Sequence, residues 1–238
     1  TGSFDTSRAV LMDTGGSIDV AAGSTLGLDG PLLGAGPFFK NGAGTLALRG
    51  VNSYAGLLVL TGGTLRIDQD ANLGTGAGSL LLGGGALATT STFDISRRVV
   101  LDATAMAGFD VAGGTTLGLN GQISGAGMLV KAGAGTLALR GDNYYGGGTT
   151  ILDGVLQVDH DRNLGYPSGA LKLDGGALAA TGRFDTSRAV TLAQAGRFDV
   201  AAGVTLGLGG IVSGSGDLIK SGAGTLRLSH TGNAYGNT

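Results

Sequence analysis

The chain has 238 residues, of which 50 are Gly, and it contains no Cys and no Trp. A hydrophobic fraction of 42%, a charged fraction of 13% and a net charge of −2 exclude simple disorder, and they give no reason to expect electrostatic binding of nucleic acid or of an acidic membrane. Gly does not recur at every third position and only 3 Pro are present, which excludes collagen, and no run of 18 apolar residues exists that would span a membrane as a helix.

Short strands, rather than helices, are predicted along the chain. Glu is absent and Gly and Thr are abundant, a composition that disfavours helices. Two apolar residues repeatedly flank one polar or small residue, so both apolar side chains point to the same face of an extended segment. In chain order through the better-patterned half, these segments are residues 137–139, 156–158, 171–173, 190–192, 198–200, 206–208 and 226–228. Turns rich in Gly, such as Asp174-Gly175-Gly176, separate the segments.

A long internal repeat organises the chain. Lys40–Arg49 and Lys131–Arg140 have nearly the same sequence, and Lys220–Leu228 is a third copy. The first step is 91 residues and the second is 89 residues. Internal repetition takes priority over other signals when a fold is predicted, so we expect one continuous array. Its copies are residues 1–39, 40–130, 131–219 and 220–238, with rough boundaries. The first and last copies are incomplete, which predicts that the chain is part of a longer protein.

Several short strands per copy, with no helix between them, leave three architectures open. In a parallel β-solenoid, turns of roughly 20 residues would stack about 4.8 Å apart, giving roughly eleven turns around a column of Leu, Val, Ile and Ala. A string of β-sandwich domains fits the repeat length, but not the absence of Trp, the scarcity of Pro or the abundance of Gly. A propeller with two blades per copy lacks its usual aromatic and Asp signatures. These observations favour the solenoid.

Residues 125–158 resemble the autotransporter-associated β-strand repeat, also called the passenger-associated transport repeat. The resemblance is carried by the run Lys131-Ala132-Gly133-Ala134-Gly135-Thr136-Leu137 and by the segments on either side of it. Residues 34–67 form another copy, in which Leu57-Leu58 departs from the Gly-Gly-Thr of the pattern. Residues 214–238 form a third copy, which is incomplete. The resemblance covers most of the chain.

The resemblance implies an all-β fold, a right-handed parallel β-helix, in the passenger region of a type V secreted protein of Gram-negative bacteria. Such a passenger is displayed at the cell surface and is anchored at the outer membrane by a C-terminal β-barrel, which these 238 residues do not include. A chain without Cys agrees with this family, because disulfides hinder passage through the barrel. Each emerging turn can stack on the previous one, so the repeat is expected to assist its own secretion.

Arg140-Gly141-Asp142 spells the tripeptide that integrins read. The repeat itself requires Arg-Gly at this place, as Arg49-Gly50 shows, and the first copy has Val51 at the position of Asp142. We therefore interpret the tripeptide as a product of the repeat, with Asp142 as a chance companion.

Two Asp-x-Asp-x-Asn segments, residues 68–72 and 159–163, place oxygen ligands at alternate positions, as calcium sites do. Leu73 and Leu164 stand where a calcium loop needs Gly, and no carboxylate stands at the twelfth position of either segment. Asp and Asn also start turns and cap short helices without an ion. No metal site is therefore predicted.

Three Asp–Arg pairs recur with a spacing of three residues, each after a Phe. They are Asp5/Arg8 after Phe4, Asp94/Arg97 after Phe93, and Asp185/Arg188 after Phe184. We expect the Phe to enter the core and the Asp–Arg pair to brace a corner of the turn. Exposed pairs of this kind contribute at most about 1 kcal/mol.

No catalytic residue and no cofactor site is predicted. Asp19, Asp110 and Asp199 recur at one position of the repeat, whereas a catalytic centre is usually unique, and Asp110 and Asp199 should lie far apart along the axis. His160 and His230 have no equivalent partners with which to form a catalytic group.

Tyrosines follow the Asn of the repeat, and two interpretations apply to them. The rings could stack on sugars; alternatively, each ring closes a corner of the turn while the Asn bonds the turn backbone, which is the interpretation that we favour. The tyrosines are Tyr54, Tyr144, Tyr145 and Tyr235, and the Asn residues are Asn52, Asn143 and Asn233.

Together these features predict an elongated, non-enzymatic passenger stalk at the cell surface, with adhesion to host or bacterial cells or self-association as its task. Unpaired strand edges at the ends of the chain predict end-to-end association that depends on concentration. The alternative is a surface polysaccharide lyase or hydrolase, because a β-helix can carry two or three convergent acids. No nucleic acid, cofactor or metal ion is expected as a partner.

Overall fold

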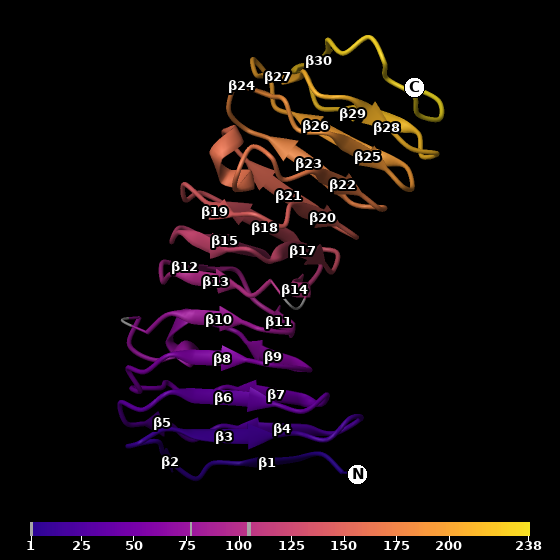
Figure 1. The fold of residues 1–238 in the computed structure, drawn as a ribbon. Coiled ribbons are helices and arrows are strands. Elements are labelled where there is room, and N and C mark those ends of the chain that lie inside the picture. Colours follow the sequence, from indigo (N-terminus) through magenta and orange to yellow (C-terminus); the bar gives the residue numbers. More distant parts are fainter. Residues whose placement is uncertain (1, 77, 104–105) are drawn as a thin grey trace.

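The computed structural model describes residues 2–76, 78–103 and 106–238 as one column of stacked turns (Figure 1). Residues 1, 77 and 104–105, which fall within the predicted copies, lie outside the described residues. Strands of successive turns pair in parallel. The predicted all-β parallel solenoid is confirmed, and it excludes the sandwich and propeller alternatives. The longest sheet has 11 strands, which delimit about 10 turns where roughly eleven were predicted.

Each turn contributes to three faces of the column in succession. The first face is the 11-stranded sheet. Its strands are β1 (Phe4–Thr6), β4 (Thr25–Leu28), β7 (Thr45–Leu48), β9 (Thr64–Ile67), β11 (Gly85–Thr89), β14 (Met106–Val111), β17 (Met128–Ala132), β20 (Thr149–Ile151), β22 (Leu171–Leu173), β25 (Val190–Leu192) and β28 (Val212–Ser213).

The second and third faces are each divided into two sheets. The second face holds β2 (Val10–Leu11) and β5 (Leu32–Leu33), and then β12 (Phe93–Ile95), β15 (Thr116–Leu119), β18 (Thr136–Leu139), β21 (Val155–Val158), β23 (Ala177–Ala180), β26 (Gly196–Val200) and β29 (Leu218–Ser221). The third face holds β3 (Gly16–Asp19), β6 (Phe38–Asn41), β8 (Leu58–Leu60), β10 (Leu80–Leu82), β13 (Val99–Leu101), β16 (Ile123–Gly125) and β19 (Tyr144–Tyr145), and then β24 (Phe184–Thr186), β27 (Thr205–Leu208) and β30 (Thr225–Leu228).

Two short 3-10 helices mark the places where the second and third faces are divided. Helix η1 (Asp70–Leu73) interrupts the second face, and helix η2 (Asp161–Leu164), its equivalent one copy later, interrupts the third. Gly74 and Gly165 end these helices with φ values of 84° and 77°, a conformation that favours Gly. Within the described ranges, no helix has the length and apolar character needed to cross a bilayer.

The long repeat moves to a new face with each copy. The equivalent strands β1, β12 and β24 lie on the first, second and third faces respectively. Between β1 and β12 the chain completes four turns and then one further face. The repeat of about 90 residues is therefore not a whole number of turns, and equivalent side chains of successive copies point in different directions.

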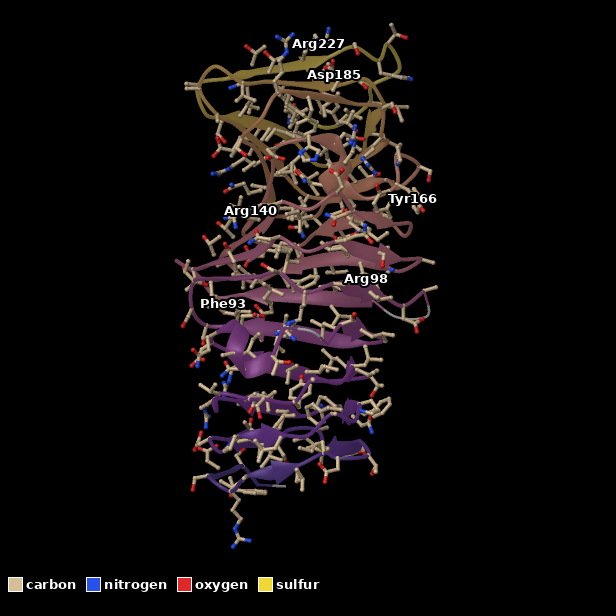
Figure 2. The ribbon with its side chains drawn as sticks, turned by 90° about the vertical axis from the view of Figure 1, so that its left-hand side faces the viewer. Phe93, Arg98, Arg140, Tyr166, Asp185 and Arg227 are labelled. Carbon is tan, nitrogen blue, oxygen red and sulfur yellow. The ribbon has the colours of Figure 1, made fainter. Side chains whose placement is uncertain are left out.

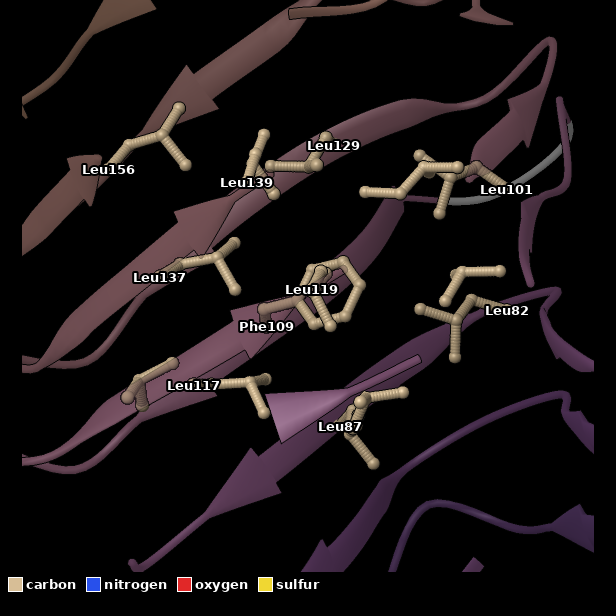
Figure 3. Close-up of a cluster of buried hydrophobic side chains, with 14 of the residues drawn as sticks. Leu82, Leu87, Leu101, Phe109, Leu117, Leu119, Leu129, Leu137, Leu139 and Leu156 are labelled. Atoms are coloured by element: carbon tan, nitrogen blue, oxygen red, sulfur yellow. The ribbon is translucent and has the colours of Figure 1, made fainter. Parts of the chain in front are cut away.

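The core is a column of aliphatic side chains stacked in register. Leu26, Leu46, Leu65 and Leu87 are consecutive partners on the first face, and Phe109 follows Leu87. Figure 3 shows the middle of this column, where the side chains from the three faces meet. Most of these side chains are fully buried, and each buried Leu or Phe contributes roughly 1.5–3 kcal/mol relative to exposure. All of the segments predicted from apolar alternation are strands.

A buried lysine, Lys40 or Lys131, closes one corner of the turn at equivalent positions of two successive copies. Lys131 is fully buried, and its Nζ donates to the carbonyl oxygens of Ala132 (2.9 Å), Gly133 (2.6 Å) and, one turn further on, Asp153 (3.1 Å). Lys40 is also fully buried and makes the equivalent three bonds. The ammonium group thus ties a sharp corner to the next turn.

We predict that Lys131→Met destabilises the chain by about 2 kcal/mol, because three carbonyl oxygens lose the charged donor of a fully buried side chain. Chemical denaturation with purified protein measures this loss. Lys220→Met is the matched control: Lys220 occupies the same repeat position but is exposed and bonds only two carbonyls, so its loss should stay below about 1 kcal/mol. Equal losses of unfolding free energy in the two variants would show that burial of the lysine and its third bond do not add to stability.

Candidate binding surface

The recurrent Asp and Arg side chains form ion pairs that span two turns. Arg140 Nη1 donates to Asp94 Oδ1 at 2.7 Å, and Gly118 lies in the turn between them. A Cβ at Gly118 would lie 2.0 Å from Asp94 Oδ1, so Gly leaves the space that the pair occupies. Arg49–Asp5, at 3.1 Å, is the equivalent pair one copy earlier. One copy later Ser229 stands at the position of Arg140, and Asp185 pairs instead at 2.8 Å with Arg227, which occupies the position of Ala138. Figure 2 shows Arg140 and the Asp185–Arg227 pair at different heights of the column.

A second set of arginines is buried over the 3-10 helices. Arg188 Nε donates to Asp161 Oδ1 at 2.9 Å, and Arg188 Nη2 donates to the Gly165 carbonyl at 2.8 Å. Arg97 makes equivalent contacts with η1, including the Asp70 carboxylate at 3.1 Å. These guanidinium groups satisfy carbonyls at the end of each 3-10 helix, which otherwise lack donors.

The predicted Asp–Arg pairing within one corner is therefore wrong. The predicted pairs were Asp5/Arg8, Asp94/Arg97 and Asp185/Arg188. Asp94 and Asp185 point outward from their strands, whereas Arg97 and Arg188 are buried against the preceding turn. The prediction for the Phe residues holds in part: Phe184 is buried and Phe93 is half-buried, but Phe4 is 64% exposed.

The Asp-x-Asp-x-Asn segments start the 3-10 helices. Asn163 Oδ1 accepts hydrogen bonds from the backbone N–H groups of Asp159 (2.9 Å) and His160 (3.1 Å), and Asn72 does the same in the first copy. Among the residues that the structure describes, no group of three His, Cys, Asp or Glu side chains is placed to hold a metal ion. The Asn oxygen has backbone donors as its partners.

The Asn of the repeat bonds the backbone of neighbouring turns, as predicted. Asn143 Oδ1 accepts from the Ile123 N–H at 2.8 Å, and Asn143 Nδ2 donates to the Asn163 carbonyl at 2.7 Å. Asn52 makes the same two kinds of bond in the first copy. Asn233 Oδ1 accepts from the Val212 N–H at 2.9 Å.

The tyrosines divide into buried and exposed rings. Tyr54 and Tyr145 are buried, in agreement with the corner-closing interpretation, and the hydroxyl groups of Tyr145 and Thr149 lie 2.7 Å apart. Tyr144 was expected to behave in the same way but is 45% exposed. It meets the exposed ring of Tyr166, which the sequence analysis did not single out, with ring centroids 5.9 Å apart. The signal that was missed is the departure of both residues from the repeat.

Both charged side chains of Arg140-Gly141-Asp142 have partners in other turns of the column. Arg140 bonds Asp94, as described above, and Asp142 Oδ1 lies 2.9 Å from His160 Nε2. Asp142 Oδ2 also accepts from Arg162 at 3.4 Å. The Arg140 contact recurs one copy earlier as Arg49–Asp5, whereas the partners of Asp142 do not recur. The interpretation of the tripeptide as a product of the repeat stays a prediction.

The three recurrent mid-strand carboxylates lie on different faces, and one of them, Asp110, acts on a buried lysine. Asp19 belongs to β3 on the third face, Asp110 to β14 on the first, and Asp199 to β26 on the second. Burial lowers the pKa of Lys131 to about 8, and the charges of Asp153 and Asp110 oppose this shift. Asp110 therefore favours the charged form of a structural lysine, and it shares no site with Asp199.

Comparison with known proteins identifies the family of the repeats in this chain. The model of the passenger-associated-transport-repeat matches residues 38–67, 129–158 and 218–238. The chain carries the repeats of an autotransporter passenger. The matches begin four residues after the copies predicted from the sequence, which started at 34, 125 and 214. Each begins at the strand that holds the repeat lysine, namely β6, β17 and β29.

Two curated proteins resemble parts of this passenger chain. The adhesin BmaC autotransporter of Brucella suis biovar 1 (strain 1330) is 42% identical over 146 residues, which is 61% of this chain and 4% of the adhesin. An extracellular serine protease of Serratia marcescens is 58% identical over 38 residues, which is 16% of this chain and 4% of the protease. The chain thus covers a small part of each relative. No solved structure matches it.

We predict that millimolar calcium leaves the thermal unfolding midpoint of the passenger chain unchanged, because backbone donors occupy the Asn oxygens of both Asp-x-Asp-x-Asn segments. Magnesium at the same ionic strength is the control for salt effects. A calcium-specific rise of several degrees would reveal a metal site at these segments.

We predict that His160 titrates above its ordinary pKa. The hydrogen bond to Asp142 raises the pKa of the His160 imidazole, and the contact with Asp159 adds to the effect, while burial opposes it. The stabilisation from this contact is full below about pH 6.5, the ordinary value, and is lost as the pH rises through the folded-state pKa. NMR titration of a His230→Gln chain, which keeps a single histidine, measures the pKa. Asp142→Asn should lower it, and an unchanged value would contradict the assignment.

Proposed function

We propose that this chain is a stretch of an adhesive stalk that its parent protein displays outside a Gram-negative cell, anchored at the outer membrane. The observation that carries the proposal is the 42% identity to an adhesin autotransporter over 146 residues of one continuous stack. A parallel solenoid adds about 4.8 Å of length with each turn, so it separates what it carries from the membrane. The partner would be a host or bacterial cell surface, or a second copy of the stalk.

The contacts between turns support a role in the protein's own secretion. Lys131 reaches the Asp153 carbonyl of the next turn, and Asn143 reaches the Asn163 carbonyl in the same direction. Each new turn therefore meets side-chain donors as well as strand edges on the turn before it. Folding that propagates along the axis in this way would favour outward movement of the chain.

An enzymatic role has less support. Asp110 and Asp199, the mid-strand carboxylates considered for a polysaccharide lyase or hydrolase, lie on different faces. Convergent acids are what such chemistry requires. The relationship to a serine protease extends over 38 residues only. We therefore propose that this stretch is non-enzymatic, and an activity screen on acidic polysaccharides with and without calcium checks this.

We predict that beads coated with the folded chain adhere to cultured host cells or to bacteria, and that the soluble chain competes for this binding. Counting attached beads by microscopy measures the effect. Beads coated with heat-unfolded chain are the control, because they carry the same composition without the ordered surface. Attachment no greater than that of albumin-coated beads to either cell type would contradict the adhesive role.

We predict that removal of residues 40–130 from the displayed parent protein preserves surface display, because residue 39 then meets an equivalent turn at residue 131. Removal of residues 40–120 breaks the register and should reduce display strongly. Flow cytometry with an antibody against another part of the passenger measures display. Unchanged adhesion per displayed molecule after the first deletion would favour a transport role alone, and equal display of both deletions would contradict the stacking argument.

A further inference from the structure

A groove of about 530 Å³ lies on the third face of the column. Arg98, which precedes β13, lies at one end, and Tyr144 of β19 and Tyr166, after η2, lie at the other. Figure 2 shows Arg98 and Tyr166 toward one side of the column, away from Phe93 and Arg140. The groove crosses four successive turns, which at about 4.8 Å per step is about 14 Å. It is long enough for a few linked pyranose rings.

Four of the five large or polar side chains of the groove depart from the repeat, and the fifth, Ser124, recurs one copy later as Ser213. Arg98, Gln122, Ser124, Tyr144 and Tyr166 line the groove. The equivalent positions one copy earlier hold Ala9, Pro31, Leu33, Ser53 and Thr75. Residues that build the column recur from copy to copy, as the buried lysines do. A set that occurs once and comes together in one place is therefore not explained by the architecture of the repeat.

The two tyrosines form an exposed aromatic corner. Tyr144 is 45% exposed and Tyr166 is 50% exposed, and their rings meet edge to face with an angle of 71°. In an edge-to-face pair, one ring contacts the other only through its edge. Neither face of that ring is covered by its partner. The next residue, Tyr145, already fills the core, so Tyr144 is not needed to close the turn. An exposed aromatic face is a surface on which the C–H groups of a pyranose can stack.

The other end of the groove is cationic. Arg98 Nε and Nη2 donate to Ser124 Oγ at 3.3 and 3.1 Å, which holds the guanidinium in place. Ser124 is buried and Arg98 is exposed. Among the described residues that line the groove, none carries a carboxylate and Arg98 is the ionised one. The guanidinium is positioned to donate hydrogen bonds to a carboxylate, and Gln122 also lines the groove and offers an amide group to hydroxyls or acetamido groups.

We infer that this groove binds an oligosaccharide that carries carboxylates, with a pyranose ring stacked on the Tyr144–Tyr166 pair and a carboxylate on Arg98. The inference rests on the proposed adhesive function and gives its partner a chemical class. Stacking supplies affinity for pyranoses in general, and Arg98 supplies the preference for an acidic chain.

Isothermal titration calorimetry on the 238-residue chain tests the inference with two probes of equal length. Hyaluronan hexasaccharide alternates uronic acid with N-acetylglucosamine, and chitohexaose has N-acetylglucosamine alone. The unchanged chain should bind the hyaluronan probe about tenfold or more tightly than chitohexaose, since a charge-assisted bond is lost in the second case. Arg98→Gln should remove this preference, and the double variant Tyr144→Ala/Tyr166→Ala should remove binding of both probes.

Two further variants separate loss of binding from loss of folding. Gly146→Leu fills the groove with the aromatic pair intact, because a Cβ at Gly146 would lie 3.9 Å from Tyr166 and from Ala126, in ordinary contact. It should abolish binding while the unfolding midpoint stays unchanged. Phe39→Ala is the matched control, since Phe39 is a 36% exposed aromatic residue of β6 on the same face but outside the groove. It should leave both affinities unchanged.

The inference is overturned if the unchanged chain binds neither probe, binds both equally, or keeps its affinity for the hyaluronan probe in Gly146→Leu or in the double tyrosine variant. Bead adhesion distinguishes this failure from failure of the proposed function. If the beads adhere but the chain binds neither saccharide, the adhesive function is retained and the groove is not its binding site. Beads that do not adhere would remove the adhesive role itself.

Discussion

Register between successive turns is the constraint on which this molecule depends. Leu46 must lie between Leu26 and Leu65 for the ladder of backbone hydrogen bonds and the buried column to form together, because a slip of one residue would turn every apolar side chain outward. The turns nevertheless differ in length: Leu46 pairs with a residue 19 positions later, whereas Phe93 pairs with one 24 positions later.

The side chains that support this register contact residues of other turns. The sequence alone could predict them only where the relevant property is local to one strand. Apolar alternation such as Leu137-Ala138-Leu139 identified the strands, because which side of a strand is buried is a local property. The partner of Asp94 could not be found in this way. Its ion pair is with Arg140, 46 residues later, and not with nearby Arg97, because proximity across turns depends on turn length. The buried lysine was missed for a related reason, since its carbonyl partners carry no side-chain signal.

Repetition separates architecture from function in this chain. Tyr145 and Tyr54 occupy equivalent positions and are buried, so they belong to the column. Tyr144 and Tyr166 have no aromatic equivalents in the first copy, and they lie exposed together above a groove. The sequence pattern alone grouped Tyr144 with Tyr145, because both follow Asn143. Only the alternation of inward and outward side chains along β19 distinguishes them, and that assignment requires knowledge of which of the two faces the core.

The extra face in each repeat has a consequence for the parent protein. Three copies, about 270 residues, would complete a whole number of turns, thirteen, over about 62 Å of column. A motif that recurs once per copy therefore lies on each of the three faces in turn. Over three copies, one example of it faces each side of the column. Gain or loss of a single copy in the gene would leave the stacking intact yet reorient everything beyond the junction by about 120°. In a parent protein of the kind proposed above, copy number would set the direction in which a distal domain points, as well as its distance from the membrane.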